Sequence, residues 1–494
     1  METLQYVLQV FSPGNLWVLL IGVIGGTIIG ALPGLTATMG VALLIPMTFG
    51  MTPIMGLNML LGIYIGGIYG GCISSILLRT PGTPASAATV LDGYPMAQKG
   101  EAKKALGMAT IASFIGGIAS SIILVLMAPM LAEWALKFGP PEYFALAVFG
   151  LTIIASLSAD VLKGLLAGFV GMFLSTVGAD PISGSFRFNF GVSGFADGIA
   201  FIPALIGLFA ISEVFVQLEL LFGKQEKTIT LSGSIPSFKE TLGCWRTLVR
   251  GSLIGTFIGI VPGTGSGTAS WISYSEAKRA SKTPELYGTG YLDGIAATES
   301  ANNAVCGGAL VPLLALGIPG DSVTAVLIGG LMIQGLTPGP MLFAQHPDVV
   351  VGMFTGSFIA NFFMLATGLI GLRFYARVLD IPKKLLVMAI VLFCFLGAYA
   401  INMNSIDLLT MIFFGVIGYI MQKFDFSLAA VCIALILGPI AEANMRLALL
   451  GADNNPIVFV STPISAIFMA LALISLCWPV IRQLRTGKGP LGTE

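Results

Sequence analysis

Long apolar stretches occupy most of this 494-residue chain, and they constrain its fold more than any other feature. A helix that crosses a bilayer needs about 20 predominantly apolar residues. The stretches lack the period-two alternation of strands in a membrane barrel. They lie near residues 15–32, 54–78, 105–131, 142–158, 161–178, 198–222, 248–261, 295–316, 348–372, 385–401, 405–421, 426–440 and 460–481. The pattern predicts an all-α, polytopic membrane protein.

The scarcity of charge excludes the alternative of a soluble protein with a very large core. Only 10% of the residues are charged, whereas a soluble domain has about 25%. The formal net charge is zero, so the chain has no basic field for binding nucleic acid. His346 is the only histidine, and the six cysteines are scattered singly. We therefore expect no metal and no cofactor.

One Pro-Gly sequence motif occurs twice. GTIIGALPG begins at Gly26 and GTFIGIVPG begins at Gly255, and six of the nine positions are identical. A second pair follows in the same order, with SAATVLDGYPMAQ at 86–98 and SVTAVLIGGLMIQ at 322–334. The repetition predicts two related halves, residues 1–222 and 248–494. The polar segment 223–247 between them is expected to be a cytoplasmic connector.

The distribution of lysine and arginine predicts that the halves have opposite orientations. The segment after 86–98 contains Lys99, Lys103 and Lys104. The corresponding segment after 322–334, residues 335–348, contains neither lysine nor arginine. Short cytoplasmic loops collect these residues. The topology that keeps the loops with lysine and arginine in the cytoplasm places the N-terminus outside and the C-terminus inside. Inverted-topology repeats of this kind are characteristic of secondary transporters.

Each half contains two Pro-Gly breaks: ALPGLT (31–36) and RTPGTPAS (79–86), then IVPGTGSGT (260–268) and LGIPGDS (316–322). Backbone groups freed at a broken helix or re-entrant hairpin cannot face lipid, so they line a polar site or are buried in protein. Helix N-termini attract anions, and freed carbonyls coordinate small cations. The alternative is that the breaks are static kinks with capping hydroxyls. The predicted substrate-binding residues are Pro33, Gly34, Thr36, Arg79, Thr80, Gly263, Thr264, Gly265, Ser266 and Thr268.

Polar and charged residues at membrane depth are functional candidates. Glu299, with Asn302 and Asn303, could carry a coupling proton or face a cation; alternatively it is a hydrogen-bonded packing group. Arg79 either neutralises a carboxylate or extends to the inner interface, and Asp321 is placed to cap the next half-helix. The predicted ion-coupling residues are Pro262, Glu299, Ser300, Asn302, Asn303, Pro319 and Gly320.

The sequence lacks the residues and motifs that an enzymatic function would need. The GTGSGT segment does not end in the Gly-Lys-Ser/Thr of a phosphate-binding loop, so the chain is not expected to be an ATPase. A membrane-embedded enzyme would need a convergent nucleophile, acid or metal site. With one histidine in a loop and few intramembrane acids, we expect no enzyme.

Four segments, residues 30–49, 79–100, 262–290 and 299–340, resemble the large membrane subunit of the tripartite tricarboxylate transporters. The resemblance extends over essentially the whole chain. It implies a translocation pathway for citrate or other carboxylates, driven by a Na⁺ or H⁺ gradient in a bacterial inner membrane. It also implies a small membrane subunit and a periplasmic substrate-binding protein as partners. The family motifs correspond here to Pro33, Gly34, Pro262, Gly263, Gly265, Glu299, Ser300, Asn302 and Asn303.

The alternative within transport is a self-sufficient carrier that works without a binding protein. A binding protein would need a docking surface on the outer face, for which residues 180–197 and 336–348 are candidates. The sequence does not identify the carboxylate or separate Na⁺ from H⁺ coupling.

Overall fold

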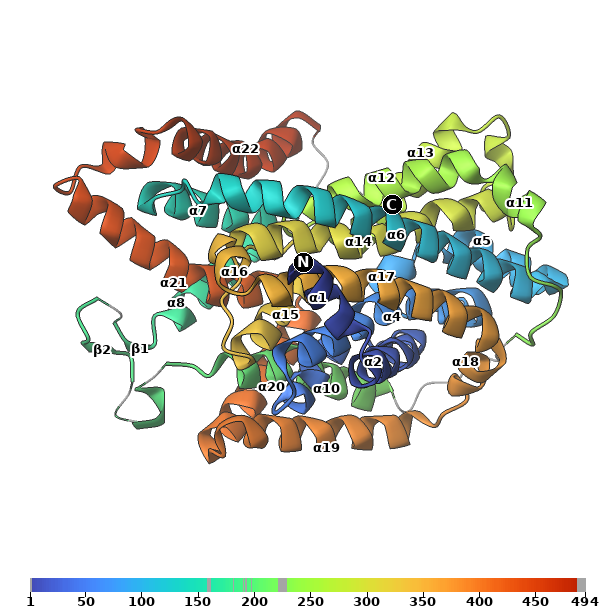
Figure 1. Ribbon diagram of the computed structural model, residues 1–494, viewed down its shortest axis with the longest axis horizontal. Helices are drawn as coiled ribbons and strands as arrows, with labels where there is room; N and C mark the ends of the chain where they lie inside the picture. Colours follow the sequence, from blue (N-terminus) through green and yellow to red (C-terminus); the bar gives the residue numbers. More distant parts are fainter. Residues whose placement is uncertain are drawn as a thin grey trace. The chain divides into compact units, whose positions relative to one another are not determined.

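The computed structural model describes residues 2–157, 161–180, 182–189, 191, 193–196, 198–220 and 229–486. Regular structure in these ranges is almost entirely helical (Figure 1). The strands β1 (Gly178–Ala179) and β2 (Phe186–Arg187) form one short antiparallel pair. Eight helical segments of the described ranges are long and apolar enough to cross a membrane. The predicted all-α, polytopic membrane fold is confirmed.

Each predicted apolar stretch coincides with a helical segment, to within several residues at most ends, whereas shorter helices such as Ala37–Leu44, Gly265–Ala280 and Ser322–Ile333 lie outside the predicted stretches. The stretch near 426–440 is the largest exception, because its helix continues to Gly451. The helices are α1 (Glu2–Val10), α2 (Pro13–Ala31), α3 (Ala37–Leu44), α4 (Pro53–Leu78), α5 (Val90–Met96), α6 (Ala102–Ala135), α7 (Pro140–Leu157), α8 (Val161–Ser175), α9 (Phe201–Leu205), α10 (Ser212–Leu220), α11 (Phe238–Gly243), α12 (Trp245–Ile260), α13 (Gly265–Ala280), α14 (Leu292–Leu316), α15 (Ser322–Ile333), α16 (Pro340–Gln345), α17 (Pro347–Ile370), α18 (Leu372–Val378), α19 (Lys383–Asn402), α20 (Ser405–Lys423), α21 (Leu428–Gly451) and α22 (Pro463–Thr486).

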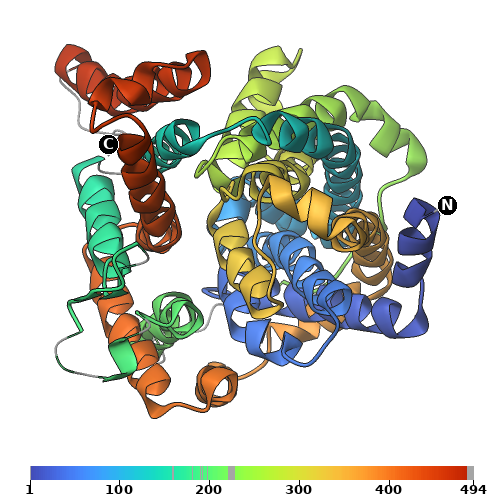
Figure 2. The ribbon, with the colours of Figure 1, turned by 60° about the vertical axis from the view of Figure 1, so that its left-hand side comes forward.

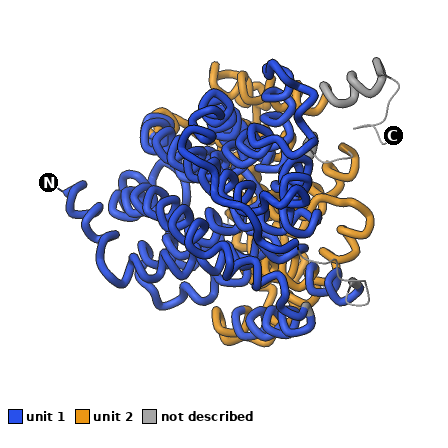
Figure 3. Tube along the Cα trace, turned by 90° about the vertical axis from the view of Figure 1, so that its right-hand side faces the viewer, with its two compact units in different colours: residues 1–132, 213–397 blue, residues 133–212, 398–494 orange. Residues whose placement is uncertain are grey.

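The chain divides into two compact units, and each unit combines two separate stretches of sequence (Figure 3). Unit 1 contains residues 1–132 and 213–397, and unit 2 contains residues 133–212 and 398–494. All four Pro-Gly breaks lie in unit 1. The candidate site is therefore built within one unit.

Two helix pairs, α2 with α4 and α12 with α14, run side by side in unit 1 (Figure 1). Small residues allow helix backbones in a membrane protein to approach closely. A Cβ added at Gly26 would lie 2.4 Å from the carbonyl oxygen of Ile63, and one at Gly255 would lie 2.2 Å from that of Ala301. Either atom would clash, so both pairs need glycine at the crossing.

The glycines of the two pairs follow the same spacing. Gly22, Gly26 and Gly30 face successive turns of α4, and Gly251, Gly255 and Gly259 face successive turns of α14. Each member of the second set comes 229 residues after its counterpart. The two halves of the chain thus pack α2 on α4 and α12 on α14 through corresponding positions.

The connector packs on unit 1 in the part that the structure describes; its residues 223–228 lie outside the described ranges. The backbone N–H of Ile229 donates to the carbonyl of Leu77. Lys104 of α6 forms a 2.5 Å ion pair with Glu240, and this pairing lowers the pKa of Glu240 to about 2. A backbone hydrogen bond therefore holds the connector to the end of α4, and an ion pair holds it to the start of α6.

Unit 2 is built around α7, α8, α21 and α22, and α20 packs on residues 206–211 (Figure 2). The short β1–β2 hairpin is tied to α21 by four charged side chains. Arg446 lies 2.6 Å from Asp180, and Arg187 lies 2.6 Å from Glu442. Backbone N–H groups and Arg446 hold the pKa of Asp180 well below its usual range. Of the docking candidate 180–197, residues 181, 190, 192 and 197 lie outside the described ranges.

Candidate functional site

Each helix of the two pairs ends at one of the four Pro-Gly breaks. The helices α2 and α12 end at Ala31 and Ile260, the first residues of the first and third breaks. The helices α4 and α14 end at Leu78 and Leu316, at the start of the second and fourth. A new helical segment follows the Pro-Gly pair of every break: α3, the 3₁₀ turn Pro84–Ser86, α13 and α15. Each break thus ends one helix and creates the N-terminus of a new helical segment.

Within each half, the two breaks meet through glycines that leave no room for a side chain. A Cβ on Gly82 would lie 2.3 Å from the carbonyl oxygen of Gly30, and one on Gly320 would lie 2.5 Å from that of Gly259. In the second half, the N–H of Gly263 also donates to the carbonyl of Gly320 at 2.7 Å. The predicted residues Gly263 and Gly320 are therefore brought together.

Pro262 and Pro319 precede these two glycines. Pro319 is buried and Pro262 is partly buried. Proline cannot donate to the helix ladder, which explains why both helices stop here. The two prolines shape the breaks, and they offer no side-chain ligand.

The N-termini after the second and fourth breaks carry corresponding capping boxes. Thr83 and Ser86 exchange side-chain and backbone contacts at the 3₁₀ turn, and Asp321 and Thr324 do so at α15. The carboxylate of Asp321 accepts the N–H of Thr324 at 2.8 Å and the hydroxyl of Tyr64 at 2.6 Å. The predicted capping role of Asp321 is confirmed.

Helix starts from opposite halves of the chain meet in two corresponding pairs. The hydroxyls of Thr38, in α3, and Ser322, in α15, are 2.9 Å apart. At the other pair, a Cβ on Gly267 of α13 would lie 3.5 Å from the carbonyl oxygen of Pro84. Both pairs join the segment after one half's first break to the segment after the other half's second break.

The start of α13 is open. Within the described residues no side chain caps it, and the hydroxyl of Thr264 instead donates back to the carbonyls of Ile258 and Val261 at 2.5 and 2.9 Å. Gly265 has a φ of 70° and no atom within 4 Å of an added Cβ. Ser266 is buried and Thr268 is exposed. Uncapped backbone N–H groups in the first turn favour an anion.

The first break differs from the third in its surroundings. Thr36 caps α3 by accepting the N–H of Met39 at 3.2 Å. Gly34, next to Pro33, has a φ of 90° and packs against the side chains of Gln217 and Glu213 in α10. The first break is thus closed by a side-chain cap and a neighbouring helix, whereas the start of α13 stays open.

Glu299 is completely buried in α14 and is held by neutral donors. Thr89 donates a short hydrogen bond to one carboxylate oxygen. Ser113 of α6 and the amide of Asn302 donate to the other, both at 3.3 Å. Among the described residues, no lysine or arginine forms an ion pair with Glu299.

Two asparagines that follow Glu299 on α14 have buried amide atoms without partners. Asn302 and Asn303 are both completely buried. Asn302 uses its Nδ2 to reach Glu299 and the carbonyl of Ile68, and its Oδ1 has no partner among the described residues. Both polar atoms of Asn303 are also unpartnered there. Such unpartnered groups are rare in native proteins.

Ser300 lies apart from this cluster. Its hydroxyl donates to the carbonyl of Ala296 at 2.7 Å, and it packs against Gly251 of α12. Its contacts are those of a helix-packing residue. A role for Ser300 in ion coupling stays a prediction.

Arg79 and Thr80 are exposed at the end of α4. Arg79 adopts a left-handed conformation, with a φ of 60°, and its guanidinium lies 5.9 Å from the ring centre of Tyr94. The hydroxyl of Thr80 contacts the carbonyl of Leu78 at 3.4 Å. No described hydrogen bond or ion pair joins these two residues to the other candidates, so their substrate role stays a prediction.

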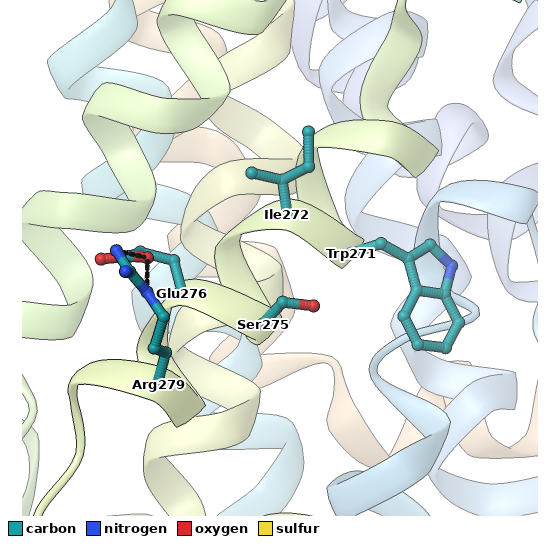
Figure 4. A pocket seen from close by; sticks show the side chains of 5 residues that line it. All are labelled: Trp271, Ile272, Ser275, Glu276 and Arg279. Atoms are coloured by element: carbon teal, nitrogen blue, oxygen red, sulfur yellow. Dashed lines mark hydrogen bonds and ion pairs between the residues drawn. The ribbon is translucent and has the colours of Figure 1, made fainter. Parts of the chain in front are cut away.

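A shallow hollow on α13 lies on the exposed face of this helix (Figure 4). Trp271, Ile272 and Ser275 line it, together with the ion pair between Glu276 and Arg279. The opposite face of α13 packs on α14, where Ser270 and Ser273 donate to backbone carbonyls. The hollow is therefore separate from the meeting points of the breaks.

Sequence reasoning missed several residues of the site. Thr89 and Ser113 donate to Glu299, and Tyr64 donates to Asp321. Thr89 follows the second break closely, which is a weak local signal. Ser113 and Tyr64 lie within helices, and only the helix packing reveals their partners.

Comparison with known proteins decides the family. The model of the "Tripartite tricarboxylate transporter TctA family" matches residues 16–433. The chain belongs to this family. The family comprises membrane components of transporters, and the helical architecture makes this TctA-family chain a multi-pass membrane protein.

Two relatives of the TctA-family chain come from Agrobacterium vitis. One, described as "Uncharacterized 52.8 kDa protein in TAR-I ttuC' 3'region", is 37% identical over 98% of this chain and 96% of its own length. The other, described as "Uncharacterized protein in TAR-II ttuC' 3'region", is 33% identical over 49% of this chain and 99% of its own length. No solved structure matches the chain.

Proposed function

We propose that the chain forms the transmembrane pathway of a secondary active importer for citrate or other di- and tricarboxylates. The observation that carries the proposal is the meeting of helix starts from opposite halves of the chain, at Thr38 with Ser322 and at Gly267 with Pro84. Helix N-termini directed at one site favour negatively charged groups. A carboxylate substrate supplies such groups.

The open start of α13 is the part of this site that best fits a carboxylate. The backbone N–H groups of Gly265 and Ser266, with the hydroxyl of Thr268 nearby, provide donors, and the first turn of α13 contains no acidic residue. At α15, by contrast, the negative charge of Asp321 already occupies the cap. Substrate would therefore bind mainly between α13 and the turn Pro84–Ser86. Arg79 and Thr80, and Pro33, Gly34 and Thr36 of the first break, remain proposed contributors.

Two inverted repeats, residues 1–222 and 248–494, are the proposed organisation, with 223–247 as a cytoplasmic connector. The corresponding glycine contacts and capping boxes of the two halves support it. Each half also contributes to both units: residues 1–132, 213–222 and 248–397 lie in unit 1, and residues 133–212 and 398–494 lie in unit 2. This division supports alternating access by movement of one unit relative to the other.

Coupling to a Na⁺ or H⁺ gradient is proposed to involve the α14 cluster and the third and fourth breaks. Glu299, Asn302 and Asn303 supply the polar groups, and Pro262, Pro319 and Gly320 shape the backbone of the two breaks. A buried carboxylate without a cationic partner is costly and requires compensation. A transported cation provides that compensation.

The proposed setting is a bacterial inner membrane, with the N-terminus in the periplasm and the C-terminus in the cytoplasm. The name of the family supports a three-component system. The proposed partners are a small membrane subunit and a periplasmic substrate-binding protein, which would dock on the outer face at 180–197 or 336–348.

The test is uptake of labelled citrate into proteoliposomes that contain the chain and its small partner. Uptake should require the binding protein and either a Na⁺ or an H⁺ gradient. Uptake that does not require the binding protein would indicate a self-sufficient carrier. No uptake under any gradient, for citrate and for a panel of other carboxylates, would contradict the proposal.

A further inference from the structure

We infer that α11 and the start of α12 form a binding site for an anionic phospholipid, whose headgroup phosphate is bound by Lys239, Arg246 and Arg250. The ligand is a component of the surrounding bilayer and is not transported, so the inference goes beyond the proposed function. The site lies at the end of α12 that is remote from the Pro-Gly breaks, because Trp245 begins this helix and the third break ends it.

An exposed apolar ridge is the first observation. On α12, large apolar side chains that are about half exposed or more recur every four residues, at Trp245, Val249, Leu253 and Phe257. Residues four positions apart share one helix face, and a contiguous exposed apolar surface marks a face that contacts a membrane or a partner. The preceding helix, α11, adds Phe238 and Leu242, which are 82% and 56% exposed. The ridge thus reaches the connector, where the bilayer meets water in the proposed topology.

Three cationic side chains beside the end of this ridge are the second, independent observation. Lys239 and Arg246 are exposed, and Arg250 is partly exposed. None of the three forms an ion pair among the described residues. The guanidinium of Arg246 lies 5.5 Å from the ring centre of Trp245, which places one of the cations directly against the ridge.

The acidic side chains of the same region are already engaged by other groups. Glu240 pairs with Lys104 of α6 at 2.5 Å. Asp293 accepts the hydroxyls of Thr247 and Tyr287 at 2.9 and 2.6 Å. The positive charge at the start of α12 is therefore available to an anion from outside the chain.

An anionic phospholipid satisfies the ridge and the cations at the same time. Its acyl chains would cover the apolar side chains, and its phosphate would accept charge-assisted hydrogen bonds from the arginines. Tryptophan, lysine and arginine gather at the boundary between bilayer and water, and basic clusters next to a membrane helix attract anionic lipids. A soluble anion would engage the cations and leave the ridge uncovered, whereas a zwitterionic lipid would cover the ridge and bring no net negative charge.

Bound lipid would also act on the helix that leads to the proposed substrate site. The helix α12 packs closely on α14 through Gly251 and Gly255, and it ends at the third break. A lipid held at its start would favour the folded arrangement of these two helices. A ligand that binds only the folded state raises its thermal stability.

The test is thermal unfolding of the purified full-length chain in a neutral detergent, with increasing amounts of dioleoylphosphatidylglycerol. We expect saturable stabilisation, with bound lipid counted by native mass spectrometry of the same samples. Dioleoylphosphatidylcholine should act at least about tenfold more weakly, because it carries no net charge. Inorganic phosphate at matched ionic strength should not stabilise the chain.

Removal of the cations should weaken binding of the anionic lipid in proportion to the charge lost. Arg246→Gln should lower the apparent affinity about fivefold, and the combination of Lys239→Gln, Arg246→Gln and Arg250→Gln should lower it about a hundredfold. Arg246→Lys keeps the charge and should bind within about twofold of the wild type.

Lys137→Gln is the matched control for the loss of one positive charge. Lys137 is exposed beyond the end of α6, and Glu133 lies one helical turn before it. Its replacement should leave the affinity for the anionic lipid unchanged. Size-exclusion profiles identify any variant that does not fold, and the single variants of Arg246 keep the test decisive if the triple variant misfolds.

Equal stabilisation by the anionic and the zwitterionic lipid would overturn the inference, and so would wild-type affinity in the folded triple variant. Equal loss in Arg246→Lys and Arg246→Gln would contradict recognition by charge. Stabilisation by inorganic phosphate alone would assign the cations to a soluble anion instead of a lipid. None of these outcomes depends on carboxylate uptake, so the lipid site and the proposed function can fail separately.

Discussion

The buried carboxylate of Asp321 accepts hydrogen bonds from groups within the protein. It caps α15 and accepts the hydroxyl of Tyr64. Asp321→Ala should lower the free energy of unfolding by about 1–3 kcal/mol, because the cap is lost and the Tyr64 hydroxyl loses its acceptor. Asp321→Asn should cost much less, since asparagine is an equally good cap. Thermal unfolding in detergent measures both, and equal losses would contradict the capping account.

Asp92 organises the loop between α13 and α14. Its carboxylate accepts the N–H groups of Gly288, Gly290 and Tyr291 at 2.8–2.9 Å, and the hydroxyl of Tyr274 at 2.8 Å. Asp92→Ala should therefore accelerate amide hydrogen exchange in this loop about tenfold or more.

Asp348→Ala, in the first turn of α17, is the control for this measurement and should leave exchange in the loop unchanged. Unaltered exchange in Asp92→Ala would mean that the loop keeps its conformation without the carboxylate.

At the scale of the helices, the close pairing of α2 with α4 predicts position-specific sensitivity to one methyl group. Gly26→Ala would place a Cβ 2.4 Å from the Ile63 carbonyl, whereas Gly25→Ala meets nothing within 4 Å. Gly26→Ala should destabilise the protein by about 1–3 kcal/mol. Gly25→Ala should be neutral or stabilising by up to about 1 kcal/mol. Similar melting temperatures for the two variants would contradict this packing.

The positions of helices and breaks could be predicted from sequence because both depend on local properties. Apolar length determines where a helix spans the membrane, and proline or glycine determines where α2, α4, α12 and α14 end. The contacts among segments distant in sequence could not be predicted this way. Ser113 reaches Glu299 from α6, and Gln217 of α10 covers Gly34. These contacts arise from tertiary packing and leave no periodic signal.

At the scale of the whole molecule, each compact unit needs both halves of the chain. A chain divided within the connector should therefore assemble only when both pieces, 1–222 and 229–494, are produced together. Either piece alone would expose the surfaces that its partner covers, and it should aggregate or be degraded. Size-exclusion chromatography of the co-produced and single pieces measures this. A monodisperse 1–222 piece by itself would contradict the account.

The most direct test of the central claim is equilibrium binding of labelled citrate to the purified chain carrying Gly267→Asp. The added carboxylate would lie at the open start of α13, opposite Pro84, and should repel substrate so that binding falls at least about tenfold. Ser275→Asp, on the exposed face of the same helix (Figure 4), is the matched control and should bind as the wild type does. Gly267→Ala, whose Cβ fits at 3.5 Å, separates the effect of charge from that of size. Wild-type affinity in a folded Gly267→Asp protein would contradict a carboxylate site at the paired helix starts.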